Sequence, residues 1–416
     1  MANSEHLALV KQGAEVWNSW YTKHKRVIPD LAQANLSNLN LSGINLKRAI
    51  LKQANFNNAD LSKAQLDNAN LEKANLLGTN LSNTNLKGAN LDFTILSKAV
   101  INRQTVMADK YLKVHEIVNN KAKDKDFSGI DLSNSNLFKV DLSSAELSHV
   151  KLTNANLNSA NLSNAYLYKA DLTGANLQNA DLRNAYFSQA NLTSAYFAGT
   201  LCCGTYFKDA ELKFANLKDA KLSPKTMMDL KWHSVWEIVN RGAAKKNLSG
   251  IDLSNANLQG VDFEEANLTN AKLSNAILRR SNLNNANLTN TDLVGANVCG
   301  VDLDRANLKG AKLKSVISDR HTQLSTTSGG KTSVMVKERP VKPVEKPELE
   351  SSTEIQKVEQ DEVPKTKQKG NKSYGFLFAI LATLAVGGYV FWSQSSDYPL
   401  SIRLEIWKGQ LEELIP

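Results

Sequence analysis

The residues of this chain that could do acid–base chemistry are aspartates placed directly before a large apolar residue. Asp60, Asp131, Asp171 and Asp181 each precede a leucine, at a position that Asn fills in neighbouring units. A catalytic carboxylate depends on its charge, whereas a side chain that Asn can replace serves as a turn acceptor. Hydrolase, metalloprotease, phosphate-loop and dinucleotide fingerprints are also absent from the sequence. We therefore expect no enzymatic activity and no catalytic residues.

Cysteine and histidine, the usual nucleophiles and metal ligands, are few and scattered. Of the three cysteines, Cys202 takes an inward position, while Cys203 and Cys299 are expected at the surface. This set gives no disulfide framework, so we expect reduced thiols and a cytoplasmic location for this part of the chain. The six histidines lack ligand spacing. We predict no metal site and no cofactor-binding residue.

The dominant pattern is a large apolar residue at every fifth position. It runs from Leu31 to Ile101, from Phe127 to Leu222 and from Leu248 to Leu313. On a helix of 3.6 residues per turn, a spacing of five would wind the leucines around the axis and form no face. A plain strand needs a period of two. The chain must instead turn a corner once per five residues, which predicts a wound coil of short strands, a β-solenoid.

Residue sizes within each unit agree with a coil. The large residue fills the interior, and a small residue, mostly Ala, stands two positions before it, as Ala54 does before Phe56. Asn or Asp stands between them and suits a turn, because its side chain can bond nearby backbone. The two remaining positions are polar and should face water. Stacked coils would lie about 4.8 Å apart.

The stretch from Ala54 to Leu76 reads ANFNN ADLSK AQLDN ANLEK ANL and resembles the pentapeptide-repeat family, whose motif is A(D/N)LXX. The resemblance implies an all-β fold, a right-handed quadrilateral β-helix with four repeats per coil. The lead-in GAEVWNSW followed by PDL is similar to that of cyanobacterial members of the family. Whether the three stretches form one continuous rod or three shorter rods stays open at this point.

Composition shifts divide the chain into nine segments. The predicted order is an N-terminal capping helix (1–28), a first repeat stretch (29–101), a first helical insert (102–126), a second repeat stretch (127–222), a second helical insert (223–247), a third repeat stretch (248–317), a disordered Lys/Glu/Pro linker (318–373), a transmembrane helix (374–392) and a short tail (393–416).

The helical segments each admit two interpretations. Trp17 recurs at helical spacing with Val10, Ala14 and Tyr21, and predicts a helix that covers the open first coil, with an aromatic ligand box as the alternative. The two inserts repeat each other, with Glu116-Ile117-Val118-Asn119 matching residues 237–240. They either pack over the end or side of neighbouring coils or form a docking surface for a partner.

The segment from Tyr374 to Trp392 contains no charged residue and is bounded by aromatic residues. Length, apolarity and aromatic ends predict a single membrane-spanning helix. Lys365, Lys367, Lys369 and Lys372 precede it, so the positive-inside rule predicts repeats on the cytoplasmic side and a tail on the far side. The membrane itself, plasma or thylakoid, is not distinguished by the sequence.

Charge and repeat content favour an interaction protein. The first hypothesis is a non-catalytic, membrane-tethered scaffold that binds an unknown protein partner through its faces or its helical inserts. The second is a DNA mimic or topoisomerase regulator, which the net charge of +9 disfavours because such family members are strongly acidic. The same charge leaves nucleic acid a poorer partner than protein, since no dense basic cluster stands out in the coils. The third is an accessory subunit in lipid or solute export, which would need a partner or an oligomer.

Overall fold

The computed structural model describes residues 1–120 and 122–324. Three predicted segments lie wholly or largely outside them: the linker beyond Leu324, the membrane helix at 374–392 and the tail at 393–416. Within the described part, no helix combines the length and the apolar character that a membrane span requires.

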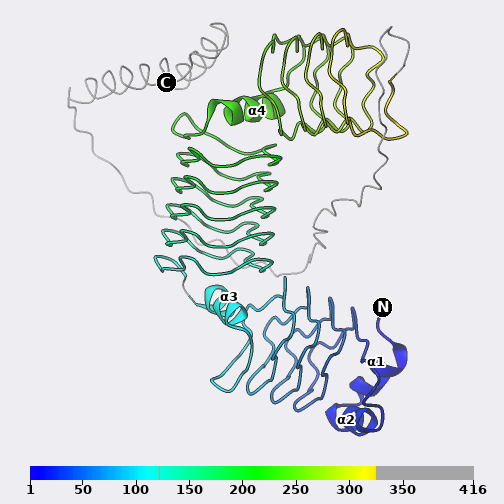
Figure 1. Cartoon of the computed structure of the whole chain (residues 1–416). Helices are drawn as coiled ribbons and strands as arrows, with labels where there is room; N and C mark the ends of the chain where they lie inside the picture. Colours follow the sequence, from blue (N-terminus) through cyan, green and yellow to red (C-terminus); the bar gives the residue numbers. More distant parts are fainter. Residues whose placement is uncertain (121, 325–416) are drawn as a thin grey trace, which may run out of the picture. The chain divides into compact units, whose positions relative to one another are not determined.

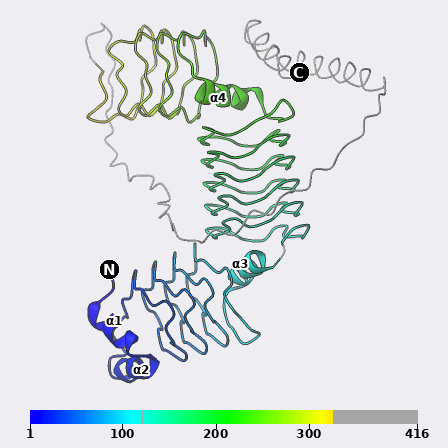
Figure 2. The same cartoon turned by 180° about the vertical axis from the view of Figure 1, so that it is seen from behind.

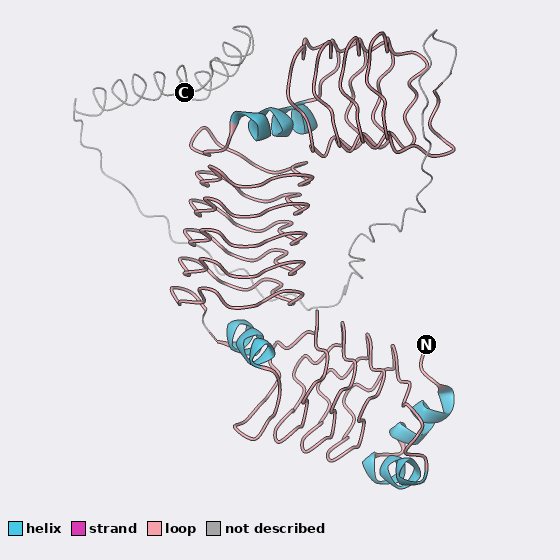
Figure 3. Ribbon diagram, in the orientation of Figure 1, coloured by secondary structure: helices cyan, strands magenta, loops and turns pink. Residues whose placement is uncertain are grey.

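The repeats form stacked coils whose neighbouring turns pair through parallel bridges. Bridged residues stand 20 positions apart, as in Asp30↔Ile50, Asp126↔Glu146 and Asn247↔Asn267. Four five-residue units therefore complete one coil. The bridges define block 1 (residues 30–106), block 2 (126–227) and block 3 (247–323). Figures 1 and 2 show the stacked coils of each block. Each side of a coil pairs with the next coil through a single isolated bridge, so Figure 3 draws the coils as loops.

Each corner is a tight turn built on a left-handed residue. In the unit that begins at Leu31, the N–H of Ala34 donates to the carbonyl of Leu31 at 3.0 Å, and Gln33 between them has φ 61°. A positive φ at the third turn residue defines a type II turn. The same position is left-handed along the blocks, often at Asn or Gly, which tolerate it. Repeated right-angle corners explain why a two-residue strand alternation breaks every fifth residue.

Every backbone N–H of a typical unit finds a partner. In the unit around Phe56, the N–H groups of Phe56 and Asn58 donate to the next coil, at 2.8 and 2.9 Å. The N–H of Ala59 closes the turn to the carbonyl of Phe56 at 2.8 Å, and the N–H of Asn55 donates to the previous coil at 2.9 Å. The fifth, on Asn57, donates to Oδ1 of Asn55 at 3.0 Å. The Asn or Asp before the large residue therefore supplies the one acceptor that the backbone lacks.

The core of each block is a set of columns of Leu and Ala. Most inward Leu residues are almost wholly buried, and Phe56, Phe187, Phe197 and Phe263 take the same position. Where Thr replaces Ala, its hydroxyl donates to a backbone carbonyl, as from Thr79 to Phe56 at 2.8 Å. Cys202 is buried at an inward position as expected. The surface expectation for Cys299 is wrong: its side chain folds toward the backbone of the next coil and is 3% exposed.

Four helices accompany the coils. The single N-terminal helix that the sequence predicts is two helices, α1 (Ser4–Lys11) and α2 (Ala14–Lys23), because Gly13 adopts φ 109° between them. The inserts contain α3 (Asp109–Asn119) and α4 (Leu230–Arg241). Trp17 on α2 is fully buried against block 1, which favours the cap over a ligand box.

Each block ends on the same irregular step. The last bridges are Asn85↔Val106, Tyr206↔Met227 and Asp302↔Gln323, so the final side carries one extra residue. A threonine closes it: the Thr105 hydroxyl accepts from the N–H of Asn102 at 3.1 Å and donates to the carbonyl of Leu81 at 2.8 Å. This step breaks the period of five, so the blocks extend a few residues beyond their predicted ends.

Candidate interaction surfaces

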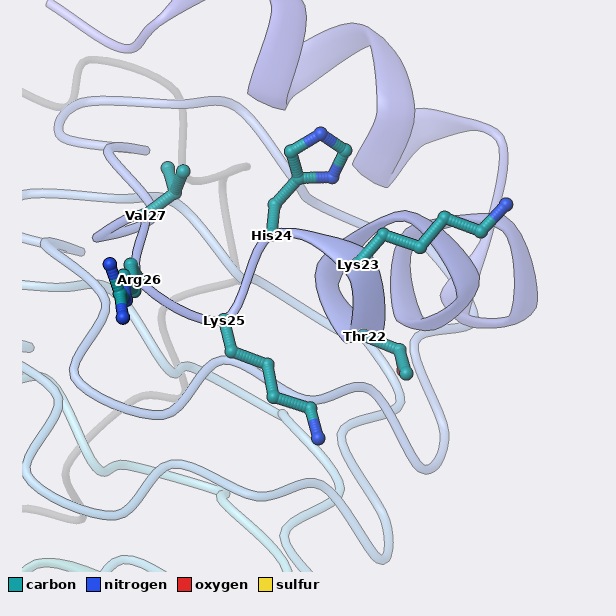
Figure 4. Close-up of a pocket in the computed structure, with 6 residues that line it drawn as sticks. All are labelled: Thr22, Lys23, His24, Lys25, Arg26 and Val27. Atoms are coloured by element: carbon teal, nitrogen blue, oxygen red, sulfur yellow. The ribbon is translucent and has the colours of Figure 1, made fainter.

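The part of the chain that the structure describes offers few candidates for a metal site or a ligand pocket. No group of three His, Cys, Asp or Glu side chains there could hold a metal ion. Two shallow depressions flank α2, of about 480 and 620 Å³. The first is lined by consecutive residues of one loop, Thr22 to Val27. Figure 4 shows its basic side chains pointing in different directions, so they do not converge on one ligand.

The aspartates that the sequence singled out lie in turns. Each accepts the N–H two residues ahead, at 2.9 Å for Asp60 and Ser62 and at 3.0 Å for Asp171 and Thr173. Burial raises the pKa of Asp171, but the hydrogen bonds from Thr173 and Thr153 together lower it by more. Its pKa therefore lies below the ordinary value. Asp131 and Asp181 follow the same logic. These carboxylates are structural acceptors.

Histidine and cysteine also have structural surroundings. Nε2 of His115 lies 2.8 Å from the carbonyl of Ala99 and must carry the proton there, since a carbonyl only accepts. Burial lowers the pKa of His233, which lies beside Trp236. Burial raises the pKa of the Cys202 thiol, which disfavours the reactive thiolate. None of these groups is poised for catalysis.

An exposed ladder of tyrosines stands on one face of block 2. Tyr166, Tyr186 and Tyr206 occupy the position before the inward residue in three successive coils, joined by bridges. Their ring centroids are 5.1 Å apart for Tyr166 and Tyr186, and 6.3 Å for Tyr186 and Tyr206. Met227 continues the column. We call these four residues the tyrosine ladder.

The tyrosine ladder leaves apolar surface in water. Tyr166 is 48% exposed, Tyr186 46% and Met227 55%. Single exposed apolar residues are ordinary, but a contiguous strip is typical of a binding surface. Tyrosine suits such a surface because it offers a large rigid ring and a hydroxyl. The strip lies among coils whose outward positions are otherwise mainly polar.

Tyrosine at this position also removes a hydrogen bond of the repeat. Asn161 and Asn191, in neighbouring units of block 2, accept the N–H of Ser163 and Thr193, each at 3.1 Å. A tyrosine cannot reach back in this way. The ladder therefore forgoes local stabilisation in exchange for exposed rings. Sequence reasoning missed these residues, although aromatic residues 20 positions apart at an Asn position are a visible signal.

Two further aromatic side chains on block 2 each contact the ammonium group of a neighbouring lysine. Nζ of Lys169 lies 5.1 Å from the ring centroid of Tyr168, and Nζ of Lys139 lies 5.0 Å from that of Phe138. Both rings are exposed, at 39% and 45%. Cation–π contacts at exposed sites are worth about 0.5–1 kcal/mol, so they orient these rings without burying them.

Helices α2, α3 and α4 each cover the end of a block. An asparagine on each helix bonds backbone groups that a neighbouring coil would bond elsewhere in the block. On block 1, Oδ1 of Asn18 accepts the N–H of Asn45 at 2.8 Å, and Nε1 of Trp17 donates to the carbonyl of Asn45 at 2.6 Å. In regular coils the backbone of the preceding coil supplies both the acceptor and the donor. The buried helix face and these bonds close the first coil.

An asparagine makes the same kind of contact where blocks 1 and 2 end. Oδ1 of Asn119 accepts the N–H of Lys98, and its Nδ2 donates to the carbonyl of Leu96 at 3.0 Å. On block 2, Asn240 bonds Asp219 and Leu217 in the same way, at 2.7 and 3.0 Å. His115 and Trp236 supply a further donor, to Ala99 and Ala220 respectively. The inserts therefore pack on coil ends, the first of the two interpretations above.

A carboxylate joins block 1, α3 and block 2. The Asp92 carboxylate accepts from Nζ of Lys110 at 2.9 Å, from the Tyr111 hydroxyl at 3.0 Å and from Nδ2 of Asn134 at 3.0 Å. The N–H of Phe93 donates to the carbonyl of Asn134 at 2.7 Å. Burial, together with nearby Asp92, raises the pKa of Tyr111 to about 12. This hydroxyl therefore stays a donor at physiological pH.

Comparison with known proteins agrees with the repeat pattern. The model of pentapeptide repeats matches residues 30–66, 64–103, 126–154, 151–189, 185–223, 247–285 and 281–317, together more than half of the chain. A search of curated proteins found no match.

Two solved structures with similar repeats come from the cyanobacterium Nostoc. HetL, a pentapeptide repeat protein involved in heterocyst differentiation regulation from the cyanobacterium Nostoc sp. strain PCC 7120, is 23% identical, with 75% of this chain and 99% of that chain covered and a TM-score of 0.17. A second Nostoc pentapeptide repeat protein, alr5209, is 35% identical over 22% of this chain and 75% of its own, with a TM-score of 0.21.

A third solved structure is QnrB1, a plasmid-mediated fluoroquinolone resistance protein, at 19% identity over 49% of this chain and 86% of its own, with a TM-score of 0.20. TM-scores this low add nothing to the assignment, which rests on the extent of the repeat match. Repeats of this kind, on coils of four units, make a right-handed β-helix. The chain therefore belongs to the pentapeptide repeat family.

Proposed function

We propose that this chain is a non-catalytic interaction module that binds a protein partner through the tyrosine ladder of block 2. A membrane helix at Tyr374–Trp392 would hold it at a membrane, with the repeat blocks on the cytoplasmic side. The activity of the module is then surface recognition, and its outward side chains, rather than a pocket, carry the specificity.

The tyrosine ladder is the observation that supports this function. The rings of Tyr166 and Tyr186 are nearly half exposed and lie over successive coils, so they offer a continuous strip to a partner. Tyrosine is among the residues that contribute most to protein–protein affinity when a partner excludes water. The ladder also forgoes the turn bonds that Asn provides in neighbouring units, which is what a surface shaped for binding rather than for stability would do.

The tether is supported by sequence. The segment 374–392 is uncharged, and four lysines precede it between residues 365 and 372. Mimicry of duplex DNA has no comparable support, because the chain carries a net charge of +9. An accessory role in export would also need a partner, but no observation on the described residues favours it.

The ladder proposal is tested with a photoreactive benzoylphenylalanine at Tyr186 of the full chain in its native membranes. We expect a crosslinked partner band that disappears when Tyr166 and Tyr206 are replaced by Asn. These replacements restore the usual residue of the repeat, so a gained turn bond and a lost ring contact, each about 1 kcal/mol, should nearly cancel in stability.

The matched control places the same photoreactive residue at Tyr196, which stands in another column of block 2. A crosslink of equal yield there, or one at Tyr186 that persists without the flanking tyrosines, would rule out the ladder as the binding surface.

The tether has a separate test. Alkaline carbonate should leave the full chain in the membrane pellet, and a tag after Pro416 should resist protease added from the cytoplasmic side. Release by carbonate would refute the tether while leaving the ladder proposal intact.

A further inference from the structure

The end of block 3 presents the same backbone groups that helices cover on blocks 1 and 2. By alignment of the final bridges, Leu96 and Leu217 correspond to Leu313, and Lys98 and Asp219 correspond to Ser315. The closing threonine is also conserved in geometry: the Thr322 hydroxyl accepts from the N–H of Asp319 and donates to the carbonyl of Val298, each at 3.1 Å. Block 3 therefore ends on the coil type to which α3 and α4 bind.

Within residues 1–120 and 122–324, no group bonds the N–H of Ser315 or the carbonyl of Val316. The corresponding groups of blocks 1 and 2 are bonded by Asn119 and His115, and by Asn240 and Trp236. Backbone groups at the end of a solenoid need such partners or water.

Apolar surface at this end is also more open than on the other blocks. Leu308 is half-buried, whereas its counterparts Leu91 and Leu212 are 2% and 1% exposed. Ala306 is likewise half-buried, against 7% exposure for Ala89 in block 1. Covering these side chains would remove apolar area from water, the main source of stabilisation when surfaces associate.

The sequence that follows block 3 lacks the element that closes blocks 1 and 2. Helices α3 and α4 begin three residues after Val106 and Met227, and contain His-Glu-Ile-Val-Asn (115–119) and Trp-Glu-Ile-Val-Asn (236–240). After Gln323 the sequence reads Leu-Ser-Thr-Thr-Ser-Gly-Gly, and the one asparagine beyond it is Asn371, in Lys-Gly-Asn-Lys. No third copy of this sequence motif therefore follows Gln323 between residues 324 and 416.

We propose that the end of block 3, formed by Leu308, Leu313, Ser315 and Val316, docks an amphipathic helix of a partner protein. The helix carries an asparagine four residues after a tryptophan or histidine, with aliphatic residues between them. Its asparagine accepts from the N–H of Ser315 and donates to the carbonyl of Leu313, and its ring N–H donates to the carbonyl of Val316. This surface is independent of the tyrosine ladder.

The probe is a labelled synthetic peptide of residues 229–242, which contains α4, with a side-chain lactam on its solvent face to hold it helical. We expect saturable binding to the full chain by fluorescence anisotropy. The same peptide with Asn240→Ala should bind about thirty-fold more weakly, since two hydrogen bonds at about 1 kcal/mol each are lost.

The matched control is a full chain in which residues 228–242 are grafted directly after Gln323. The grafted helix occupies the end of block 3 in cis, so the peptide should no longer bind. The N–H of Ser315 should become protected from hydrogen exchange in the grafted chain and stay unprotected in the parent.

Three results would overturn the inference: no saturable binding, equal binding of the Asn240→Ala peptide, or undiminished binding to the grafted chain. A fourth would assign the surface to a second copy of this chain. In that case sedimentation would show a dimer of the parent that the graft dissociates, with no peptide binding to either form.

Discussion

The residue that directs this fold locally is the Asn or Asp before each inward Leu. Its side-chain oxygen accepts the N–H that the coil backbone leaves without a partner, as between Asn70 and Glu72 at 3.1 Å. Asn and Asp serve equally as acceptors, which explains why they alternate along the repeats. They differ in charge, and this difference makes the contribution of the aspartates depend on pH.

Asp171 offers a measurable case. Burial opposes its ionisation, but the hydroxyl and N–H of Thr173, the Thr153 hydroxyl and nearby Lys151 lower its pKa below that of the unfolded chain. A lowered folded pKa contributes stability above the unfolded pKa of about 3.9 and loses it as pH falls through the folded pKa. We expect Asp171→Asn to lower the urea midpoint at pH 7 and to approach the parent near pH 3.

The control for this experiment is Asn216→Ala, which removes the bond from the N–H of Lys218 without changing charge. Its difference from the parent should be the same at pH 7 and at pH 3. A difference for Asp171→Asn that is equally constant with pH would contradict the assigned role of the carboxylate.

At the scale of elements, short helices close coils by presenting one asparagine as a piece of missing backbone. Asn18, Asn119 and Asn240 stand three residues after Glu15, Glu116 and Glu237. The amide has an acceptor and a donor on one planar group, the same pair that a peptide unit of the next coil would offer. A helix can therefore end a solenoid without a further strand, and the apolar face of the helix covers the open core.

Asn119→Ala tests this closure. The substitution leaves the N–H of Lys98 without its partner and should lower the free energy of unfolding by about 1–3 kcal/mol. Hydrogen exchange at Lys98 should accelerate in the variant. Asn120→Ala, on the exposed next residue, is the control and should change stability by less than about 0.5 kcal/mol. Equal effects of the two substitutions would show that the amide does not replace a coil.

At the scale of the molecule, the blocks are separate ladders joined through specific contacts. The N–H of Phe93 donates to Asn134 at the first junction, and that of Phe214 donates to Asn255 at the second, at 2.8 Å. The ion pairs of the two junctions differ. At the second junction Lys213 stands at the position of Asp92, and Lys231, the counterpart of Lys110, forms an ion pair with Asp252 at 3.2 Å. The duplicated inserts have therefore kept the backbone contact and changed the ionic one.

Asp92→Asn should loosen the first junction and leave the second unchanged. The variant removes a charged acceptor shared by Lys110, Tyr111 and Asn134, and bonds to charged groups are worth about 1.5–3 kcal/mol. We expect faster hydrogen exchange at Phe93 and unchanged exchange at Phe214, which serves as the internal reference. Parallel acceleration at both would mean that the carboxylate acts on global stability alone.

Much of the architecture follows from the sequence by itself. A spacing of five with small and large inward residues leaves no helix or flat strand that could bury both, so the solenoid and its core columns are fixed by local pattern. The duplicated segment after each of the first two repeat stretches likewise indicates helices at the ends of blocks.

Only the tertiary structure decides which residues meet across coils. The number of corners in a coil depends on bridges between residues 20 positions apart, such as Asp30 and Ile50, and no local propensity encodes them. The same long-range register aligns Tyr166, Tyr186 and Tyr206 into a ladder and sets Asn119 against Lys98. Both candidate surfaces, the ladder and the open end of block 3, arise from this register because stacking converts a distance along the chain into a neighbour in space.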